Sequence, residues 1–92
     1  MSKFFIEVPH EEEKVACLRA AQTLLKSGSH FLTNAEFGCL DGEHKSWIIV
    51  DVDTRETARA ILPADYRSKA KIIQLNKFNL AELDKLLSHH TD

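Results

Sequence analysis

The feature that most constrains the fold is the alternating run WIIVDVD, which ends at Asp53. Ile48, Val50 and Val52 form a purely apolar row, and the residues between them form a mixed row of Trp47, Ile49 and Asp51. Successive side chains of a β-strand point to opposite faces of the sheet. The run therefore predicts a strand with one face in a core and the other face in a partly polar environment.

The residues before this run are expected to form the other arm of a β-hairpin. Two extended segments between Ser29 and Asp53 are separated by Asp41-Gly42-Glu43-His44. Asp-Gly supplies the positive φ that a tight reversal needs, so the sequence predicts a hairpin over residues 29–53.

Hydrophobic periodicity and capping signals divide the rest of the chain. They predict strands at 3–8 and 70–77, helices at 11–26 and 55–62, and an irregular turn at 64–69. Asn79, followed three residues later by Glu82, is typical of a helix start and predicts a last helix with a stripe of leucines.

The order of these elements is β-α-β-β-α-β followed by α. This order predicts a ferredoxin-like α+β fold, with a four-stranded antiparallel sheet and two helices on one face. We expect a single domain over residues 1–92, with the first and third strands in the centre of the sheet. The apolar rows expected to face the helices are Phe4/Ile6/Val8, Ile48/Val50/Val52 and Ile73/Leu75.

Charge and cysteine usage exclude several classes of protein. The 92 residues include 12 basic and 14 acidic ones, so a nucleic acid or an anionic membrane is not expected as a partner. No apolar run approaches the ~20 residues of a membrane span, and the N-terminus does not have the pattern of a signal peptide. Cys17 and Cys39 lack CxxC spacing, and we expect two reduced thiols in a cytoplasmic protein.

The face of the sheet away from the helices is expected to be too apolar to remain in water. It is predicted to present Phe5, Glu7, Trp47, Ile49, Asp51, Ile72, Gln74 and Asn76. A contiguous apolar patch of this kind usually marks an interface or a ligand site. We expect a homodimer whose sheets face each other around a small-molecule pocket. The alternative is that the C-terminal helix covers this face of its own subunit.

Several local features occur together between Phe4 and Leu75. They are the extended arm from His30, the turn at Gly42 to His44, the strand WIIVDVD, the helix ending AILPADY and the last aliphatic strand. In these features the chain resembles the dimeric α+β barrel superfamily, in particular small proteins similar to muconolactone isomerase. The resemblance implies a dimer with a pocket between sheet and helices. Members of this superfamily include isomerases, small monooxygenases, dehalogenase-like enzymes and proteins without known activity, and the resemblance supplies no catalytic residue here.

Two sets of residues are candidates for catalysis. Glu7 and Asp51 are expected to be neighbours on the central strands, and close carboxylates in a cavity raise the pKa of at least one of them. His30, Asn34 and Glu36 are expected on one face of the first hairpin arm, with His30 or Glu36 as a base. The alternatives are a hydrogen-bonded or interfacial acidic pair, and a solvated strand edge.

Further residues are assigned to binding. Phe5 and Trp47 are expected to form apolar walls, and the polar contacts to a substrate are assigned to Asn34 and Gln74. Tyr66 either closes the mouth of the pocket or packs against the second helix. His10 is expected to be a local cap or a surface residue.

No metal and no cofactor is predicted. Cys39, Asp41, Glu43 and His44 cluster at the hairpin turn, but their spacing matches no tetrahedral zinc pattern. The preferred hypothesis is an isomerase-like acid–base enzyme with its pocket on the open sheet face. The competing hypothesis is a non-catalytic interaction module that uses the same face to dimerise.

Overall fold

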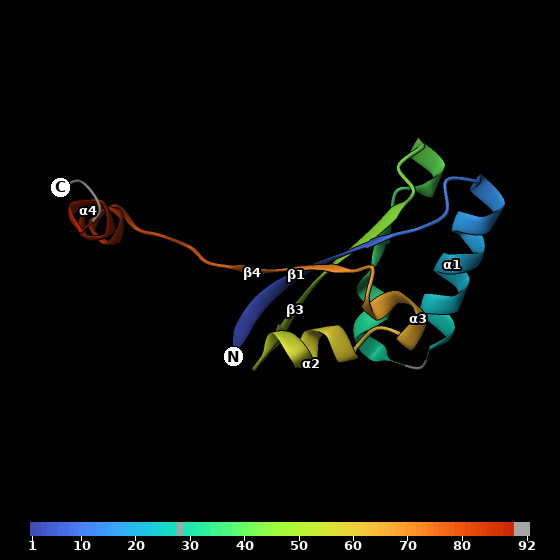
Figure 1. Cartoon of the computed structure of the whole chain (residues 1–92), viewed down its shortest axis with the longest axis horizontal. Helices are drawn as coiled ribbons and strands as arrows, with labels where there is room; N and C mark the ends of the chain where they lie inside the picture. Colours follow the sequence, from blue (N-terminus) through green and yellow to red (C-terminus); the bar gives the residue numbers. More distant parts are fainter. Residues whose placement is uncertain (28, 90–92) are drawn as a thin grey trace.

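The computed structural model describes residues 1–27 and 29–89, which form one sheet with helices on one of its faces and a last helix that stands apart (Figure 1). The sheet has the strand order β2-β3-β1-β4, and every neighbouring pair of strands is antiparallel. In chain order the elements are β1 (Ser2–Pro9), α1 (Lys14–Lys26), the 3₁₀ turn η1 (His30–Asn34), β2 (Glu36–Phe37), the 3₁₀ turn η2 (Cys39–Asp41), β3 (Lys45–Val52), α2 (Arg55–Ala60), α3 (Ala64–Arg67), β4 (Lys71–Leu75) and α4 (Leu80–Ser88).

The two long strands β1 and β3 lie in the centre of the sheet, as the sequence predicted. They pair over their whole length, with Phe4 opposite Val50 and Ile6 opposite Ile48. The protein is thus a small α+β domain with a four-stranded antiparallel sheet, an architecture compatible with a ferredoxin-like fold.

The core lies between one face of this sheet and the helices. The predicted rows of β1 and β3 are buried, and Ile6 has no exposed surface. Fully burying a side chain of this size contributes about 1.5–3 kcal/mol. The residues that cover these rows come from α1, η1, α2 and the segments beside α2 and β4, and they are Leu24, Leu32, Ala58, Leu62 and Ala70.

Strand β4 turns toward the core the face that was predicted to be open. The prediction for this strand was therefore wrong. Ile72 is buried at 7% exposure, whereas Ile73 is 38% and Leu75 36% exposed. The pairing with β1 explains the difference, because Ile72 lies opposite the buried Ile6 and Ile73 lies opposite Phe5. Because two isoleucines follow each other, the sequence does not show which of them faces the core. Only the pairing register with β1 decides it.

The first arm of the predicted hairpin is mostly not a strand. Residues 30–34 form the 3₁₀ turn η1, and β2 has only two residues, which pair with Trp47 and Ser46. The reversal itself contains Gly42 in the left-handed region, with φ of 83°. Gly38 closes the reversal, since its N–H donates to the Lys45 carbonyl at 3.1 Å and an added Cβ would lie 2.7 Å from the Glu43 carbonyl oxygen.

Helix α1 begins later than the predicted Glu11. Glu13 is its N-cap, and its carboxylate accepts hydrogen bonds from the backbone N–H groups of Val15 at 3.0 Å and Ala16 at 2.9 Å. These bonds, first that of Val15 and then that of Ala16, lower the pKa of Glu13. The predicted turn at 64–69 contains a short helix, α3.

Helix α4 stands away from the sheet at the end of an extended segment (Figure 1). None of its residues is buried, and its leucines are exposed. Within the part of the chain that the structure describes, no helix combines the length and the hydropathy that a membrane span requires.

Candidate functional site

The face of the sheet opposite the core carries an uncovered apolar centre. We call this surface the open face. Strand pairing places three cross-strand rows on it, namely Glu36–Trp47–Glu7–Lys71, Ile49–Phe5–Ile73 and Asp51–Lys3–Leu75. The middle row is entirely apolar, and Ile49 is 56% exposed. The open face is therefore more apolar than predicted, because Ile73 and Leu75 belong to it in place of Ile72.

Trp47 and Glu7 form the best-defined polar contact of the open face. The Trp47 indole N–H donates to Glu7 Oε1 at 3.0 Å, between directly paired residues of β3 and β1. Beside this pair lies a shallow hollow of about 290 Å³. Its lining brings together the predicted binding residues Phe5, Asn34 and Trp47 with Glu36.

Glu7 and Asp51 are not neighbours, contrary to the prediction. Glu7 lies opposite Trp47, whereas Asp51 lies opposite Lys3 at the other end of the strands. Four residues of strand separate the two positions, a distance of about 13 Å. Asp51 instead lines a second open hollow together with Lys3 and Lys77. The register thus separates the two carboxylates instead of bringing them together.

Three other predicted site residues lie away from the hollow at Trp47. His30 is exposed in η1, where its ring stacks on Phe31 with centroids 4.4 Å apart, and it does not share a strand face with Asn34. Gln74 lies opposite Phe4, on the helix side of the sheet. Tyr66 packs against the core from α3 and meets the His10 ring edge-on.

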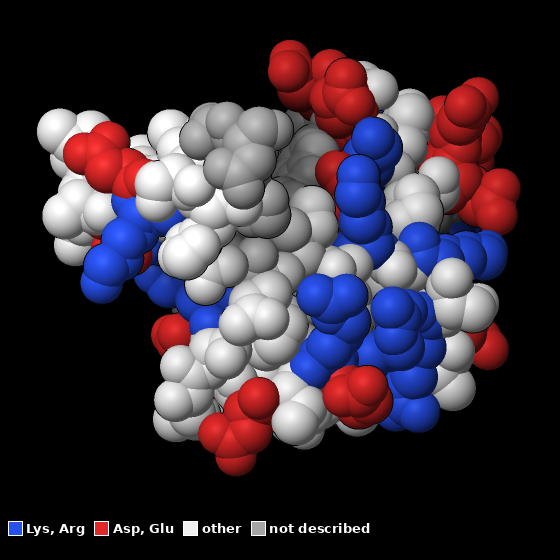
Figure 2. Space-filling model, turned by 60° about the vertical axis from the view of Figure 1, so that its left-hand side comes forward, with Lys and Arg blue, Asp and Glu red and all other residues white. Residues whose placement is uncertain are grey.

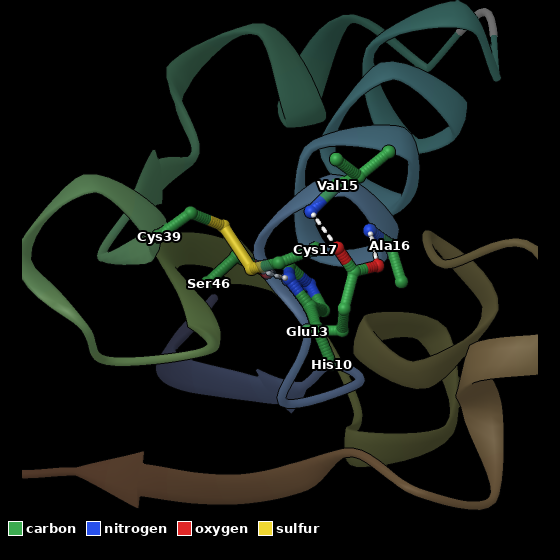
Figure 3. Close-up of a disulfide and its surroundings, with 7 residues drawn as sticks. All are labelled: His10, Glu13, Val15, Ala16, Cys17, Cys39 and Ser46. Atoms are coloured by element: carbon green, nitrogen blue, oxygen red, sulfur yellow. Dashed lines mark hydrogen bonds between the residues drawn. A yellow bond between two sulfur atoms is a disulfide. The ribbon is translucent and has the colours of Figure 1, made fainter.

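A second cluster of reactive side chains lies at the far end of β1, around a disulfide. Cys17 of α1 and Cys39 of η2 are both buried and are joined with their Cα atoms 6.1 Å apart (Figure 3). The expectation of two reduced thiols was therefore wrong. Disulfides are typical of oxidising compartments, so the cysteines do not support the predicted cytoplasmic location, which remains a prediction.

His10 connects this disulfide to the sheet. Its Nδ1 lies 3.3 Å from Cys17 Sγ, and its Nε2 lies 3.2 Å from the hydroxyl of Ser46, which is buried at 2% exposure (Figure 3). Burial lowers the pKa of His10, and the nearby His44 lowers it further. His10 thus lies between a sulfur and a hydroxyl with a lowered pKa, and is not the simple cap or surface residue that the sequence suggested.

The sequence contains only weak signals of this second cluster. Ser46 lies in the apolar row of a strand, an unusual position for a hydroxyl group, whereas Cys17 lies on the apolar stripe of a helix, where a buried cysteine is common. The residues come from three separate segments, so no local spacing connects them. Contact between α1 and η2 brings them together.

Comparison of the chain with models of protein families, with curated proteins and with solved structures gives no match.

Proposed function

We propose that the protein acts as a homodimer in which two open faces meet and enclose a small-molecule pocket beside Trp47. The observation that carries this proposal is the uncovered apolar row Ile49–Phe5–Ile73 in the centre of the sheet. Apolar surface of this kind costs about 25 cal/mol for each Å² left in water, and a second copy of the same face removes it.

The charges of the open face are compatible with self-association. A two-fold dimer brings the same patch of both subunits together, so the patch must be complementary to itself. The basic residues that strand pairing places on it are Lys3, Lys45 and Lys71, and the acidic ones are Glu7, Glu36 and Asp51. A patch with both signs can pair opposite charges across the two-fold axis. Figure 2 shows one side of the molecule, on which Lys and Arg gather centrally with acidic side chains mainly around them.

Helix α4 supports the proposal as a second uncovered apolar surface. The helix has nine residues, and isolated helices shorter than about 12–15 residues are marginal in water. Its stripe of Leu80, Leu83 and Leu87 needs a surface to pack on, and no residue of α4 is buried in the single chain. In the proposed dimer, α4 packs along the sheet of the partner and extends the interface.

The hollow that would form this pocket combines the Trp47 indole, the apolar side chain of Phe5 and the carboxylate of Glu36. Glu36 lines the hollow and has no role in the core, which suits it for moving a proton of a bound carbonyl compound. Glu7 is already engaged by the Trp47 indole, which suits it for holding that wall in place. The proposed activity is isomerase-like acid–base chemistry, with Glu36 as the base.

A non-catalytic interaction module is the second candidate function. One observation favours it, namely that the carboxylate of Glu7 is satisfied by a neighbour on its own sheet. In that case the open face serves for association alone.

Light scattering at micromolar concentration tests the dimer. The wild-type chain is expected to have the mass of two chains, and Ile49→Lys, in the centre of the open face, the mass of one. Leu40→Lys is the matched control, because Leu40 is 81% exposed in η2, outside the open face, and it is expected to leave the mass unchanged. A monomeric wild type, or an Ile49→Lys variant that stays dimeric, contradicts the proposal.

Solvent deuterium incorporation into a panel of small ketones and lactones, followed by nuclear magnetic resonance, tests the chemistry. Exchange by the wild type that is lost in Glu36→Gln but retained in Glu11→Gln, at an exposed position outside the open face, supports Glu36 as the base. A dimer that catalyses no exchange supports the interaction module.

A further inference from the structure

Three metal-binding side chains converge beside the end of β1. They are His10, Cys17 and Cys39, and their ligand atoms all lie within 4.8 Å of one another. A tetrahedral zinc ion with bonds of about 2.0–2.3 Å places its ligand atoms about 3.3–3.8 Å apart. The three groups therefore need only small side-chain rotations to reach a common ion.

The ring nitrogen of His10 that points away from the disulfide is hydrogen-bonded, as in known metal sites. A metal-binding histidine usually has its second ring nitrogen fixed by a hydrogen bond, which sets the tautomer and the ring orientation. His10 Nδ1 faces the sulfur of Cys17, and Nε2 is hydrogen-bonded to the buried hydroxyl of Ser46. A proton on Nε2 donated to Ser46 leaves the lone pair of Nδ1 directed toward the sulfurs (Figure 3).

His44 lies next to this group, although its ring nitrogens are not among the ligand atoms that lie within 4.8 Å of one another. Among the described residues, its buried Nδ1 atom has no hydrogen-bond partner. Its backbone carbonyl accepts a hydrogen bond from the backbone N–H of His10 at 2.7 Å, which holds the backbones of the two residues next to each other. A buried polar atom without a partner destabilises the fold, and a bound ion would give this atom a partner.

We propose that Cys17, Cys39 and His10 bind one zinc ion when the disulfide is reduced, and that rotation of the His44 side chain brings in the fourth ligand. Two thiolates and two imidazoles are a common donor set of tetrahedral zinc, and soft sulfur ligands disfavour magnesium and calcium. The oxidised chain, in which the two sulfurs are bonded to each other, is the metal-free form. The site is thus a switch between a disulfide and a zinc-bound dithiolate.

An entry path for the ion leads to the histidines from the surface. An open hollow of about 450 Å³ is lined by both His10 and His44, and its charged lining consists of Glu12, Glu43 and Lys45. Carboxylates at the mouth of a cleft raise the local concentration of cations.

The change from the disulfide to the zinc-bound form takes two steps. A dithiol reductant attacks the disulfide by thiol–disulfide exchange; it becomes a disulfide itself, and two electrons and two protons pass to Cys17 and Cys39. Zinc then displaces the two thiol protons, which are released to solvent as two Zn–S bonds form. Oxidation by a small disulfide reverses the sequence and expels the ion.

Titration of the phosphine-reduced chain with Co²⁺, followed by absorption spectroscopy, tests the site. The expected result is one ion per chain, with a thiolate-to-cobalt charge-transfer band, tetrahedral ligand-field bands and displacement by Zn²⁺. The oxidised chain is expected to show no such bands. Zn²⁺ is also expected to raise the Tm of the reduced chain, because binding to the folded state stabilises it.

Single-residue variants test which side chains bind the ion and which only position a ligand. Ser46→Ala is expected to weaken Co²⁺ binding about 10–100-fold, because it frees the His10 ring. His10→Ala and His44→Ala are expected to weaken it further and to change the ligand-field bands. His30→Ala, an exposed histidine outside the cluster, is the matched control and is expected to bind as the wild type does.

The proposal is overturned if reduced wild-type protein shows no charge-transfer band with stoichiometric Co²⁺. Equal affinity of His10→Ala and the wild type also overturns it. A reduced chain that is unfolded and is not refolded by Zn²⁺ overturns it as well, because a structural site contributes its binding energy to folding.

Discussion

Trp47 donates its indole N–H to the carboxylate of Glu7 at 3.0 Å, from one central strand to the other. The contact joins an apolar wall of the open face to a charged acceptor. Glu7→Ala removes the acceptor and is expected to lower the free energy of unfolding by about 1 kcal/mol. Glu7→Gln keeps an acceptor oxygen and is expected to cost less. Urea denaturation measures both values, and equal stability of Glu7→Ala and the wild type would show that the contact is energetically neutral.

The register of β4 predicts opposite outcomes for two adjacent isoleucines. Ile72→Ala leaves a cavity in the core opposite Ile6 and is expected to lower the free energy of unfolding by about 3 kcal/mol. Ile73→Ala, on the open face, is expected to cost less than about 1 kcal/mol in the monomer. Thermal or chemical denaturation at low protein concentration distinguishes them. A larger loss for Ile73→Ala would mean that the strand presents its other face to the core.

The disulfide closes a loop between residues 22 positions apart in the sequence. Loop-closure entropy predicts that Cys17→Ala/Cys39→Ala lowers the free energy of unfolding by about 3 kcal/mol. Guanidinium denaturation in the presence of a chelator measures the loss. Reduced wild-type protein under the same conditions serves as the control and should lose a similar amount. An unchanged unfolding midpoint in both samples would show that the link does not stabilise the fold.

The N-cap of α1 predicts a pH-dependent contribution to stability. Hydrogen bonds from Val15 and then Ala16 lower the pKa of Glu13 below its usual value of 4.5. The folded state thus binds the proton more weakly than the unfolded state, and stability rises with pH in this range. The contribution is complete above the unfolded pKa and is lost as the pH falls from 4.5 through the folded pKa.

The variant Glu13→Gln is therefore expected to have a lower Tm than the wild type at pH 7 and a smaller deficit below pH 4. Glu11→Gln, at an exposed position before the cap, is the matched control. A deficit that stays constant over this pH range would show that ionisation of Glu13 plays no part.

The sequence predicts most of the architecture, because alternation and capping are local signals. The strands β1 and β3, the helix after β1 and the Asn79 cap all follow from such signals, and the structure confirms them. The order of the elements also predicts the central position of β1 and β3.

The remaining errors concern relationships between distant segments. The consecutive residues Ile72 and Ile73 fit either face equally well, and only pairing with β1 selects one. Glu7 and Asp51 lie on the same face, as predicted, but the antiparallel register places them at opposite ends of it. The cluster of His10 with Cys17 and Cys39 depends on the packing of α1 against η2, for which the sequence carries no local pattern.

Trp47 provides the most direct test of the proposed dimer, because it is the single tryptophan of the chain and lies on the open face. Its fluorescence emission should be measured while the protein is diluted from micromolar to nanomolar concentration. We predict a shift to longer wavelength on dilution, as the two sheets separate and water reaches the indole, with a midpoint that moves to higher concentration in Ile49→Lys. An emission maximum that is independent of concentration, together with a monomeric mass throughout, would contradict the claim that the open face is an interface between two copies of this chain.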